Sequence, residues 1–261
     1  EVYLSFLLGV LMLIGGIFIM RTGLKKLFWH SLKTMIEGMT KTPWRSFITG
    51  TAAAAMMQSS TAVSLLTIGF VSADYLSFYQ GLGIILGANI GTCSTVQLMT
   101  LSLPDTLYLP LLLGSSLGFL FIRRFRYPFL ALTGLFSMFI GMMVLSNSLG
   151  KLVAVHTVFE YLSFAHVNPF YGILAGTLLT LLFQSSSAAT GITMVLAADN
   201  LVDLTTAAYI VYGNNIGSCL SSLVIGAAAP LAARRVAISH FVLNLGGVLI
   251  FLPLTPLLIL T

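Results

Sequence analysis

Two short polar phrases recur in this chain at a fixed spacing, and their side chains could bind ions. The sequence QSSTA at 58–62 returns as QSSSA at 184–188, and GANIGTC at 87–93 returns as GNNIGSC at 213–219, each 126 residues later. Amide and hydroxyl oxygens ligate hard cations, and the hydrogens of the same groups donate to anions. A repeated polar phrase in an apolar chain predicts a solute site whose parts are built twice.

The charges that are missing from these phrases narrow the chemistry. No charged residue or histidine lies inside either QSS phrase or in the membrane-depth halves of the segments around it. A bound multivalent anion would therefore need cations bound with it, and sodium fits, because neutral oxygens hold sodium in transporters with broken helices. Proton coupling is disfavoured, since proton relays use carboxylates or histidines within the membrane. Asp74 and Asp199 are expected to correspond with a one-residue slip and to be turn or cap residues, with cation binding as the alternative.

The composition defines the class of protein. Of the 261 residues, 7% are charged and 57% are hydrophobic, whereas a soluble domain has roughly 25% charged residues. With so few charges the outer surface must face lipid, so the composition indicates an integral membrane protein. The apolar runs are continuous rather than alternating, which excludes a membrane β-barrel. Membrane topology explains the net charge of +5, and nucleic acid is not an expected partner.

The offset of 126 residues predicts an all-α protein made of two inverted-topology repeats, 1–126 and 127–261. The two apolar segments that flank each QSS phrase are too short to cross a hydrocarbon core of about 30 Å. We therefore expect a re-entrant helical hairpin at 43–72 and another at 169–198. Each repeat also carries three spanning segments, expected at 3–20, 81–103 and 107–122, and at 128–146, 205–226 and 236–252.

The basic residues are consistent with this scheme. With three crossings in each repeat, the loops 21–45, 123–126 and 227–235 lie on one side of the membrane and hold 11 of the 12 basic residues. Such a bias marks the cytoplasmic side. The scheme therefore predicts a multi-pass protein of the plasma (inner) membrane with both ends of this chain outside. Full crossings by the hairpins would weaken the bias.

Breaks in the helices are expected at both kinds of phrase. Non-helical backbone at membrane depth is tolerated only where it lines a cavity. Glycines around both Asn-Ile-Gly phrases are expected to let the backbone leave helical geometry near the midplane; they are Gly87, Gly91, Gly213 and Gly217. Hydroxyl residues of the QSS phrases are expected to cap the returning hairpin arms, whose N-termini would then face an anion; they are Ser60, Thr61, Ser186 and Ser187.

The paired phrases QSST/QSSS and GANIGT/GNNIGS resemble those of the type II sodium-dependent phosphate cotransporter family (Na/Pi cotransporter), in its bacterial type. The sequence RRVAISHFVLNLGG at 234–247 is similar to that family's final helix, with its His-Phe and Asn-x-x-Gly pattern. The resemblance covers both repeats. Two phrases depart from the family pattern: Thr61 replaces the usual third serine, and the second GANIGT reads GNNIGS. Both departures keep a hydroxyl group where one is expected.

This resemblance implies sodium-coupled symport of inorganic phosphate by alternating access, with sodium ions co-transported and no organic cofactor. The implied phosphate ligands are Gln58, Ser59, Ser60, Thr61, Gln184, Ser185, Ser186, Ser187, Asn89 and Asn215. The implied sodium ligands are Gln58, Ser60, Thr92, Gln184, Ser186, Ser218, Asn89 and Asn215. His240 and Asn244, four apart on one helix face, are expected to hydrogen-bond to neighbouring helices, with support of the site as the functional alternative.

Other functions stay open at this point. An anion channel could use the same symmetric hairpins, although anion-selective channels tend to use rings of arginine or lysine. Another sodium-coupled anion transporter, or a membrane sensor that binds without transport, would also fit. An intramembrane serine protease built on Ser115, Ser116 and His240 is rejected, because Gly-Ser-Ser is common where helices cross. We therefore expect no enzyme, and a homodimer is left open.

Overall fold

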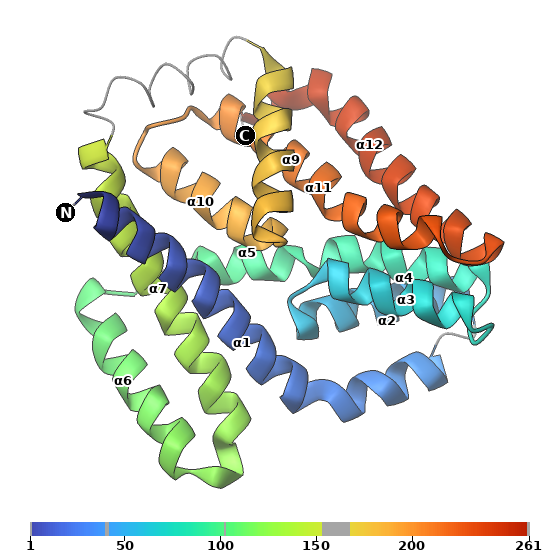
Figure 1. The fold of residues 1–261 in the computed structure, drawn as a ribbon, viewed down its shortest axis with the longest axis horizontal. Helices are drawn as coiled ribbons and strands as arrows, with labels where there is room; N and C mark the ends of the chain where they lie inside the picture. The colour runs from blue at the N-terminus through green and yellow to red at the C-terminus, as the bar shows by residue number, and fades with distance from the viewer. Residues whose placement is uncertain (1, 40–41, 102, 153–167, 260–261) are drawn as a thin grey trace. The chain divides into compact units, whose positions relative to one another are not determined.

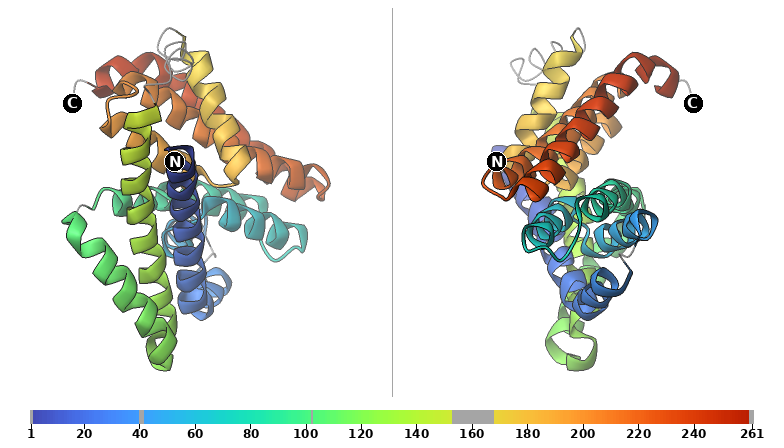
Figure 2. Two further views of the ribbon diagram at one scale, coloured as in Figure 1. Left: turned by 60° about the vertical axis from the view of Figure 1, so that its left-hand side comes forward. Right: turned by 90° about the vertical axis from the view of Figure 1, so that its right-hand side faces the viewer.

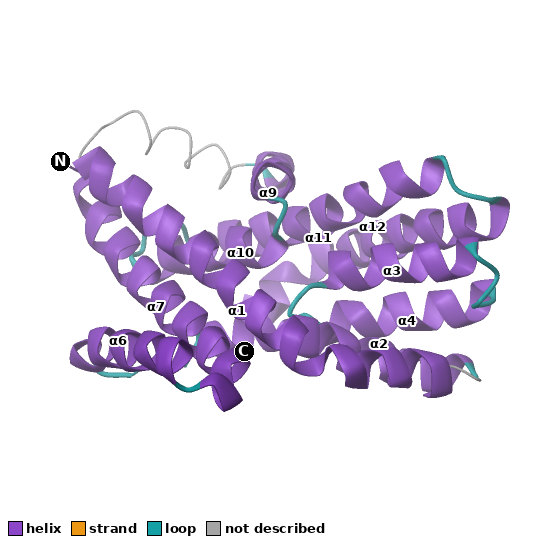
Figure 3. Cartoon of the chain, turned by 60° about the horizontal axis from the view of Figure 1, so that its bottom comes forward, coloured by secondary structure: helices purple, strands orange, loops and turns teal. Residues whose placement is uncertain are grey.

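The structure is a computed structural model, and it describes residues 2–39, 42–101, 103–152 and 168–259 (Figure 1). In these ranges the chain forms helices, turns and loops and no strand (Figure 3). Five helical stretches are long and apolar enough to cross a membrane. They are Val2–Ser31, Phe78–Met99, Arg123–Leu149, Leu204–Ala227 and Leu231–Ile259. The predicted all-α membrane class is therefore confirmed.

The sixth predicted span, at 107–122, forms a shorter helix. This helix, α6 (Asp105–Phe121), has 17 residues and carries Pro110 inside it. Its apolar side chains are exposed along its length, among them Leu109, Leu113 and Leu120. A continuous exposed apolar face suits lipid rather than water.

The chain folds into two compact units, each made of segments from both predicted repeats. One unit holds 1–22, 102–217 and 248–261, and the other holds 23–101 and 218–247. Three helices, α1 (Val2–Met39), α11 (Leu204–Ala227) and α12 (Leu231–Ile259), continue from one unit into the other. The inverted orientation of 1–126 and 127–261 stays a prediction.

The unit of 23–101 and 218–247 contains the first hairpin. Its helices are α2 (Pro43–Met57), α3 (Ser60–Ser72), α4 (Phe78–Gly91) and α5 (Cys93–Met99). Helices α2, α3 and α4 lie side by side (Figures 1 and 3), and small and branched apolar residues fill the space among them, including Ala54, Ile68 and Ile85. Val236 and Ala237 of α12 pack into the same core.

The other unit contains the second hairpin, made of α9 (Pro169–Phe183) and α10 (Ser186–Ala198). In the same unit, the first part of α1 packs along α7 (Arg126–Leu152) (Figure 2). Gly16 and Gly134 stand at this crossing, and a Cβ atom on either would overlap the backbone of the facing helix. Helix α6 packs on α7 through Gly118, which faces the ring of Phe129, and the short 3₁₀ turn η1 (Arg123–Phe125) joins the two helices.

The two hairpins have the same local structure at an offset of 126 residues. Helices α2 and α9 both begin with proline in the first turn and both have 15 residues, whereas α3 and α10 both have 13. The turns after α3 and α10 place Asp74 at φ 59° and Asn200 at φ 56°. These residues are equivalent without any slip, so the predicted pairing of Asp74 with Asp199 is wrong.

The glycines of the GANIGT and GNNIGS phrases stay helical, contrary to expectation. No glycine in the described ranges has a positive φ. Helix α11 continues through Asn215 and Gly217, and only α4 ends in its phrase, at Gly91, with Thr92 still in the right-handed helical region. The predicted break at the second phrase is therefore wrong.

These glycines instead allow two helices to cross in backbone contact. A Cβ atom on Gly87 would overlap the carbonyl oxygen of Phe47 in α2, and one on Gly213 would overlap that of Ile173 in α9. Gly50 and Gly176 make the reciprocal contacts with Ile84 and Ile210. The small residues thus fix how each hairpin sits against the helix that follows it.

Alanine at these crossings should destabilise the protein. Gly50→Ala and Gly176→Ala should each lower the free energy of unfolding by about 1–3 kcal/mol, because the added methyl group forces the helices apart. The measurement is the thermal unfolding of the purified protein in detergent. Gly69→Ala is the matched control, since Gly69 lies in α3 with no atom within 4 Å of an added Cβ. Equal unfolding temperatures in all three variants would contradict the crossing argument.

Candidate functional site: two capped helix breaks

The first QSS phrase forms a sharp break between α2 and α3. Gln58 ends α2 in the left-handed region, at φ 53° and ψ 32°, and Ser59 is extended at φ −156°. The Gln58 side chain is 3% exposed. Its Nε2 donates to the carbonyl oxygen of Ala55 at 2.6 Å and to Oγ of Ser94 at 3.0 Å. Its Oε1 is buried and has no partner among the described residues, so it is an acceptor open to a cation or a donor.

The second QSS phrase repeats this backbone closely. Gln184 ends α9 at φ 50° and ψ 30°, and Ser185 is extended at φ −155°. Nε2 of Gln184 donates to the carbonyl oxygen of Leu181 at 2.8 Å, as Gln58 does to Ala55. Unlike Gln58, Gln184 is exposed within the chain. The two phrases therefore share a backbone but differ in the burial of their glutamines.

Serine caps the helix that follows each break. Oγ of Ser59 accepts from the amide of Ala62 at 3.2 Å, and Oγ of Ser185 accepts from the amide of Ala188 at 3.2 Å. The caps are therefore Ser59 and Ser185, one residue before the expected positions. Ser60, Thr61, Ser186 and Ser187 form the first turns of α3 and α10 instead. The amides of a first turn have no carbonyl partner within the helix, so they can donate to an anion.

Asn89 belongs to a buried polar network in the same unit as the first phrase. Its Nδ2 donates to Oδ1 of Asn244 at 3.1 Å, and its Oδ1 lies 3.3 Å from Nε2 of His240. Nδ1 of His240 lies 3.0 Å from Oγ of Ser222, and Nδ2 of Asn244 contacts Sγ of Cys219 at 2.8 Å. The expected hydrogen bonds of His240 and Asn244 to neighbouring helices are confirmed. Both amide atoms of Asn89 are occupied within the protein.

Asn215, the equivalent of Asn89 in the second repeat, has different surroundings. Asn215 is exposed within the chain, and the neighbouring Asn214 is 2% exposed. Oδ1 of Asn214 accepts from Thr180 of α9 at 3.2 Å, and its Nδ2 donates to Thr190 of α10 at 3.1 Å. Asn214 therefore ties both hairpin arms to α11. Sequence reasoning missed this role, because the first repeat has Ala88 at the equivalent position.

The remaining predicted ligands divide between the two units. Thr92 donates to the carbonyl oxygen of Ala88 at 2.8 Å, and the buried Ser218 lies 3.9 Å from Sγ of Cys219. Both belong to the unit that holds the first phrase, together with Asn89. Asn215 belongs to the unit that holds the second phrase.

A charged side chain contacts the second phrase, contrary to the sequence argument. Nη2 of Arg21, from α1, donates to Oγ of Ser187 at 3.0 Å. Arg21 lies within the candidate span Val2–Ser31 rather than in a polar loop, because α1 continues as one helix through this region. Sequence reasoning missed it because Arg21 is 166 residues from its partner.

The two aspartates that follow the hairpins have the expected turn and cap positions. Asp74 lies in the turn after α3, and Asp199 caps the C-terminus of α10. Oδ1 of Asp199 accepts from Oγ of Ser146 at 2.7 Å, whereas its Oδ2 is buried and has no partner in the described ranges. No group of three or more histidine, cysteine or carboxylate ligands occurs among the described residues.

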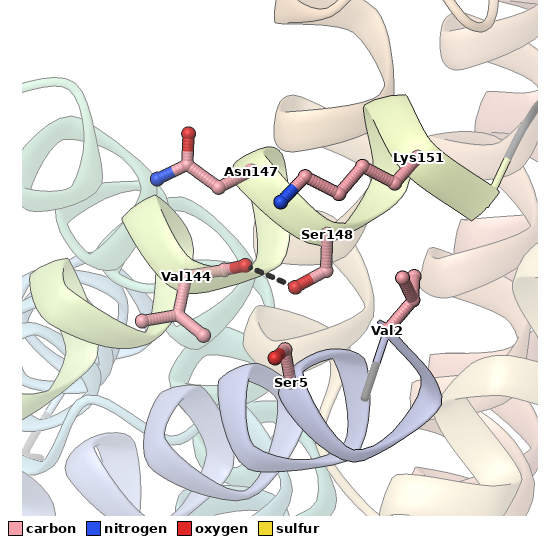
Figure 4. Close-up of a pocket in the computed structure, with 6 residues that line it drawn as sticks. All are labelled: Val2, Ser5, Val144, Asn147, Ser148 and Lys151. Carbon is pink, nitrogen blue, oxygen red and sulfur yellow. Dashed lines mark hydrogen bonds between the residues drawn. The ribbon is translucent and has the colours of Figure 1, made fainter.

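A cavity of about 260 Å³ opens between the start of α1 and the end of α7, and it is lined by Val2, Ser5, Val144, Asn147, Ser148 and Lys151 (Figure 4). None of the predicted ligands lines this cavity. Its lysine, amide and hydroxyl groups are compatible with a polar solute, but the QSS phrases are not part of it.

Comparison with known proteins identifies relatives along the whole chain. The family model described as "Na+/Pi-cotransporter" matches residues 12–147 and 138–256, so each match contains one QSS phrase. Over 97% of its length the chain is 30% identical to "Uncharacterized protein YqeW" of Bacillus subtilis (strain 168), and it covers 82% of that protein.

Two further relatives have names that mention phosphate. The chain is 29% identical over 98% of its length to "Putative inorganic phosphate export protein YjbB" of Escherichia coli (strain K12), and it spans only 47% of that protein. Over 92 residues, or 34% of the chain, it is 36% identical to "Sodium-dependent phosphate transport protein 2C" of Mus musculus, of which it covers 15%. No solved structure matches the chain.

Loss of either serine cap should destabilise the protein. Ser59→Ala and Ser185→Ala should each lower the free energy of unfolding by about 1 kcal/mol, because each leaves one amide without its acceptor. Thermal unfolding in detergent measures the change. Ser64→Ala is the control, since Oγ of Ser64 is buried in α3 and has no partner among the described residues, so its removal should cost nothing. A larger loss in Ser64→Ala than in the two cap variants would contradict the assignment.

Proposed function

Because the chain belongs to the Na+/Pi-cotransporter family, we propose that it transports inorganic phosphate across the plasma membrane together with sodium ions. Alternating access is the proposed mechanism, in which the ligands are exposed first to one side of the membrane and then to the other. The protein supplies ligands and motion and makes no covalent bond to its solutes.

The matched helix breaks are the observation that carries this proposal. In each QSS phrase the glutamine has a left-handed backbone, the next serine is extended and caps the following helix, and amides of the first turn lack a helical partner. The backbone angles of the two phrases agree within a few degrees in φ and ψ. Breaks of this kind leave backbone amides without helical partners, and in an apolar surrounding such groups need a ligand or water. Two such breaks in a chain of this family favour a polar solute with many acceptor oxygens, as phosphate is.

The proposed ligands divide by chemistry. The first turns of α3 and α10 offer amides and hydroxyls to phosphate, from Ser59, Ser60, Thr61, Ser185, Ser186 and Ser187. Sodium needs acceptor oxygens, and the buried, unpartnered Oε1 of Gln58 is the best placed of these. Gln184 is proposed as its counterpart in the second phrase. Asn89, Asn215, Thr92 and Ser218 are proposed as contributors on the sequence pattern alone.

The direction of transport follows from the gradients. A symporter couples two fluxes, so net phosphate movement reverses when the combined sodium and phosphate gradients reverse. The names of the relatives mention export in one case and sodium dependence in another. We propose one coupled mechanism that can run in both directions, with the physiological direction set by the cell.

Phosphate flux in proteoliposomes tests the proposal. With an inward sodium gradient, radiolabelled phosphate should accumulate above its equilibrium level, and a matched potassium gradient should give equilibration or no flux. Sodium-independent flux that stops at equilibrium would point to an anion channel instead. Binding without flux would point to a sensor.

The glutamines should be essential to this flux. Gln58→Ala and Gln184→Ala should each reduce sodium-dependent phosphate flux at least about a hundredfold, because each removes the side-chain amide beside a helix break. Gln97→Ala is the matched control, since Gln97 is exposed on α5 and belongs to neither phrase. Unfolding temperatures near that of the unchanged protein would show that the variants are folded. Full flux in both variants would contradict the site assignment.

A further inference from the structure

Arg21 is an arginine inside a candidate membrane span, and its guanidinium reaches the second helix break. Its Nη2 donates to Oγ of Ser187, which is 2% exposed and is the second residue of α10. A charged side chain with a buried donor is costly to hold without a partner of opposite charge. The question is which negative charge balances it.

Within the described ranges no carboxylate forms an ion pair with Arg21. Its Nε is buried and has no hydrogen-bond partner in the part of the chain that the structure describes. The aspartate of α10, Asp199, caps the other end of that helix. Thirteen residues of helix separate the two ends, which is about 18 Å at the usual rise. The guanidinium of Arg21 therefore brings a positive charge and an unused donor, Nε, to the start of α10.

The first turn of α10 adds positive potential at the same place. The amides of Ser186 and Ser187 precede the first hydrogen bond within the helix, and the positive end of the helix dipole lies there. Nε and Nη2 of an arginine form one edge of the guanidinium, and this edge binds two oxygens of a phosphate or carboxylate at once. In Arg21 that edge already meets Ser187 through Nη2, and its Nε is unpartnered.

Building on the proposed transport function, we propose that Arg21 and the first turn of α10 together bind the negatively charged oxygens of the transported anion. The ligand class is a tetrahedral oxyanion with two negative charges. Two anion oxygens are bound by the Nε–Nη2 edge of Arg21, one at each nitrogen, and the others accept from the amides and hydroxyls of Ser186 and Ser187.

The sequence repeat makes this assignment asymmetric. The position equivalent to Arg21 is Asn147, and the one equivalent to Ser187 is Thr61. Asparagine replaces arginine at this position of the repeat, and among the described residues the arginine contact to a QSS phrase is that of Arg21 with Ser187. Arg21 would supply one positive charge to the anion, so the net charge that sodium must balance is smaller than the phrases alone suggest.

Phosphate affinity in charge variants tests the proposal. Binding of radiolabelled phosphate to the purified protein in detergent is measured at saturating sodium, below and above the second pKa of free phosphate. Arg21→Gln should weaken the affinity at least about tenfold, which is about 1.4 kcal/mol, and should abolish the preference for the doubly charged form. Arg234→Gln, at an exposed arginine of α12, controls for general effects of charge and of pH on the protein.

Arg21→Lys separates a binding role from a structural one. Lysine keeps the charge but lacks the two-donor edge, so affinity should fall less than in Arg21→Gln while the preference for the doubly charged form remains. If Arg21 only ties α1 to α10, Arg21→Gln should lower the unfolding temperature and leave phosphate affinity within twofold, which would overturn the proposal. If Arg21→Gln does not fold, unchanged affinity in Arg21→Lys would overturn it equally.

The unchanged protein distinguishes failure of this inference from failure of the proposed function. Phosphate binding that requires sodium but ignores Arg21 contradicts only the role of Arg21. No phosphate binding by the unchanged protein contradicts the proposed function. Binding of sulfate, another doubly charged tetrahedral oxyanion, is then measured with the same variants. Sulfate binding that depends on Arg21 would support the anion site at Arg21 without supporting phosphate as the solute.

Discussion

A backbone amide that leaves a helix in an apolar surrounding must find an acceptor, and this constraint organises both hairpins. Each break exposes the amides of a first helical turn, where an unsatisfied polar group costs several kcal/mol. Ser59 and Ser185 each satisfy one amide. The amides between each cap and the amide that it accepts, those of Ser60 and Thr61 and of Ser186 and Ser187, have no partner within the helix and can donate to a polar solute. Each break therefore destabilises the fold through its unsatisfied amides, and the same amides can bind a solute.

Close helix crossings hold these breaks in place. Gly50 and Gly87 let α2 and α4 meet at backbone distance, and Gly176 and Gly213 do the same for α9 and α11. Polar links add to this packing, and Asn214 joins Thr180 and Thr190 across three helices. Rigid support of this kind keeps the donor groups of a first turn in position when no solute is bound.

The sequence predicted the helix boundaries on both sides of each QSS phrase well, because the signals for them are local. Proline in the first turn, the QSS phrase and the offset of 126 residues fix the helix boundaries without knowledge of the tertiary structure. The glycines were misread, since the same residue that permits a break also permits a close crossing, and only the neighbouring helix shows which applies. Arg21 was assigned to a polar loop because basic residues follow it, whereas α1 continues as one helix, and its contact with Ser187 was missed because the two residues are distant in the chain. The burial of Gln58 and the exposure of Gln184 likewise depend on neighbours that the sequence does not show.

The central claim is that phosphate and sodium bind this protein interdependently. Equilibrium phosphate affinity of the purified protein, measured in sodium and again in choline at equal ionic strength, tests it most directly. Linkage requires that sodium raise phosphate affinity by the same factor by which phosphate raises sodium affinity. We expect phosphate to bind at least about tenfold more tightly in sodium, which is about 1.4 kcal/mol of coupling. Identical phosphate affinity in the two salts would contradict the account.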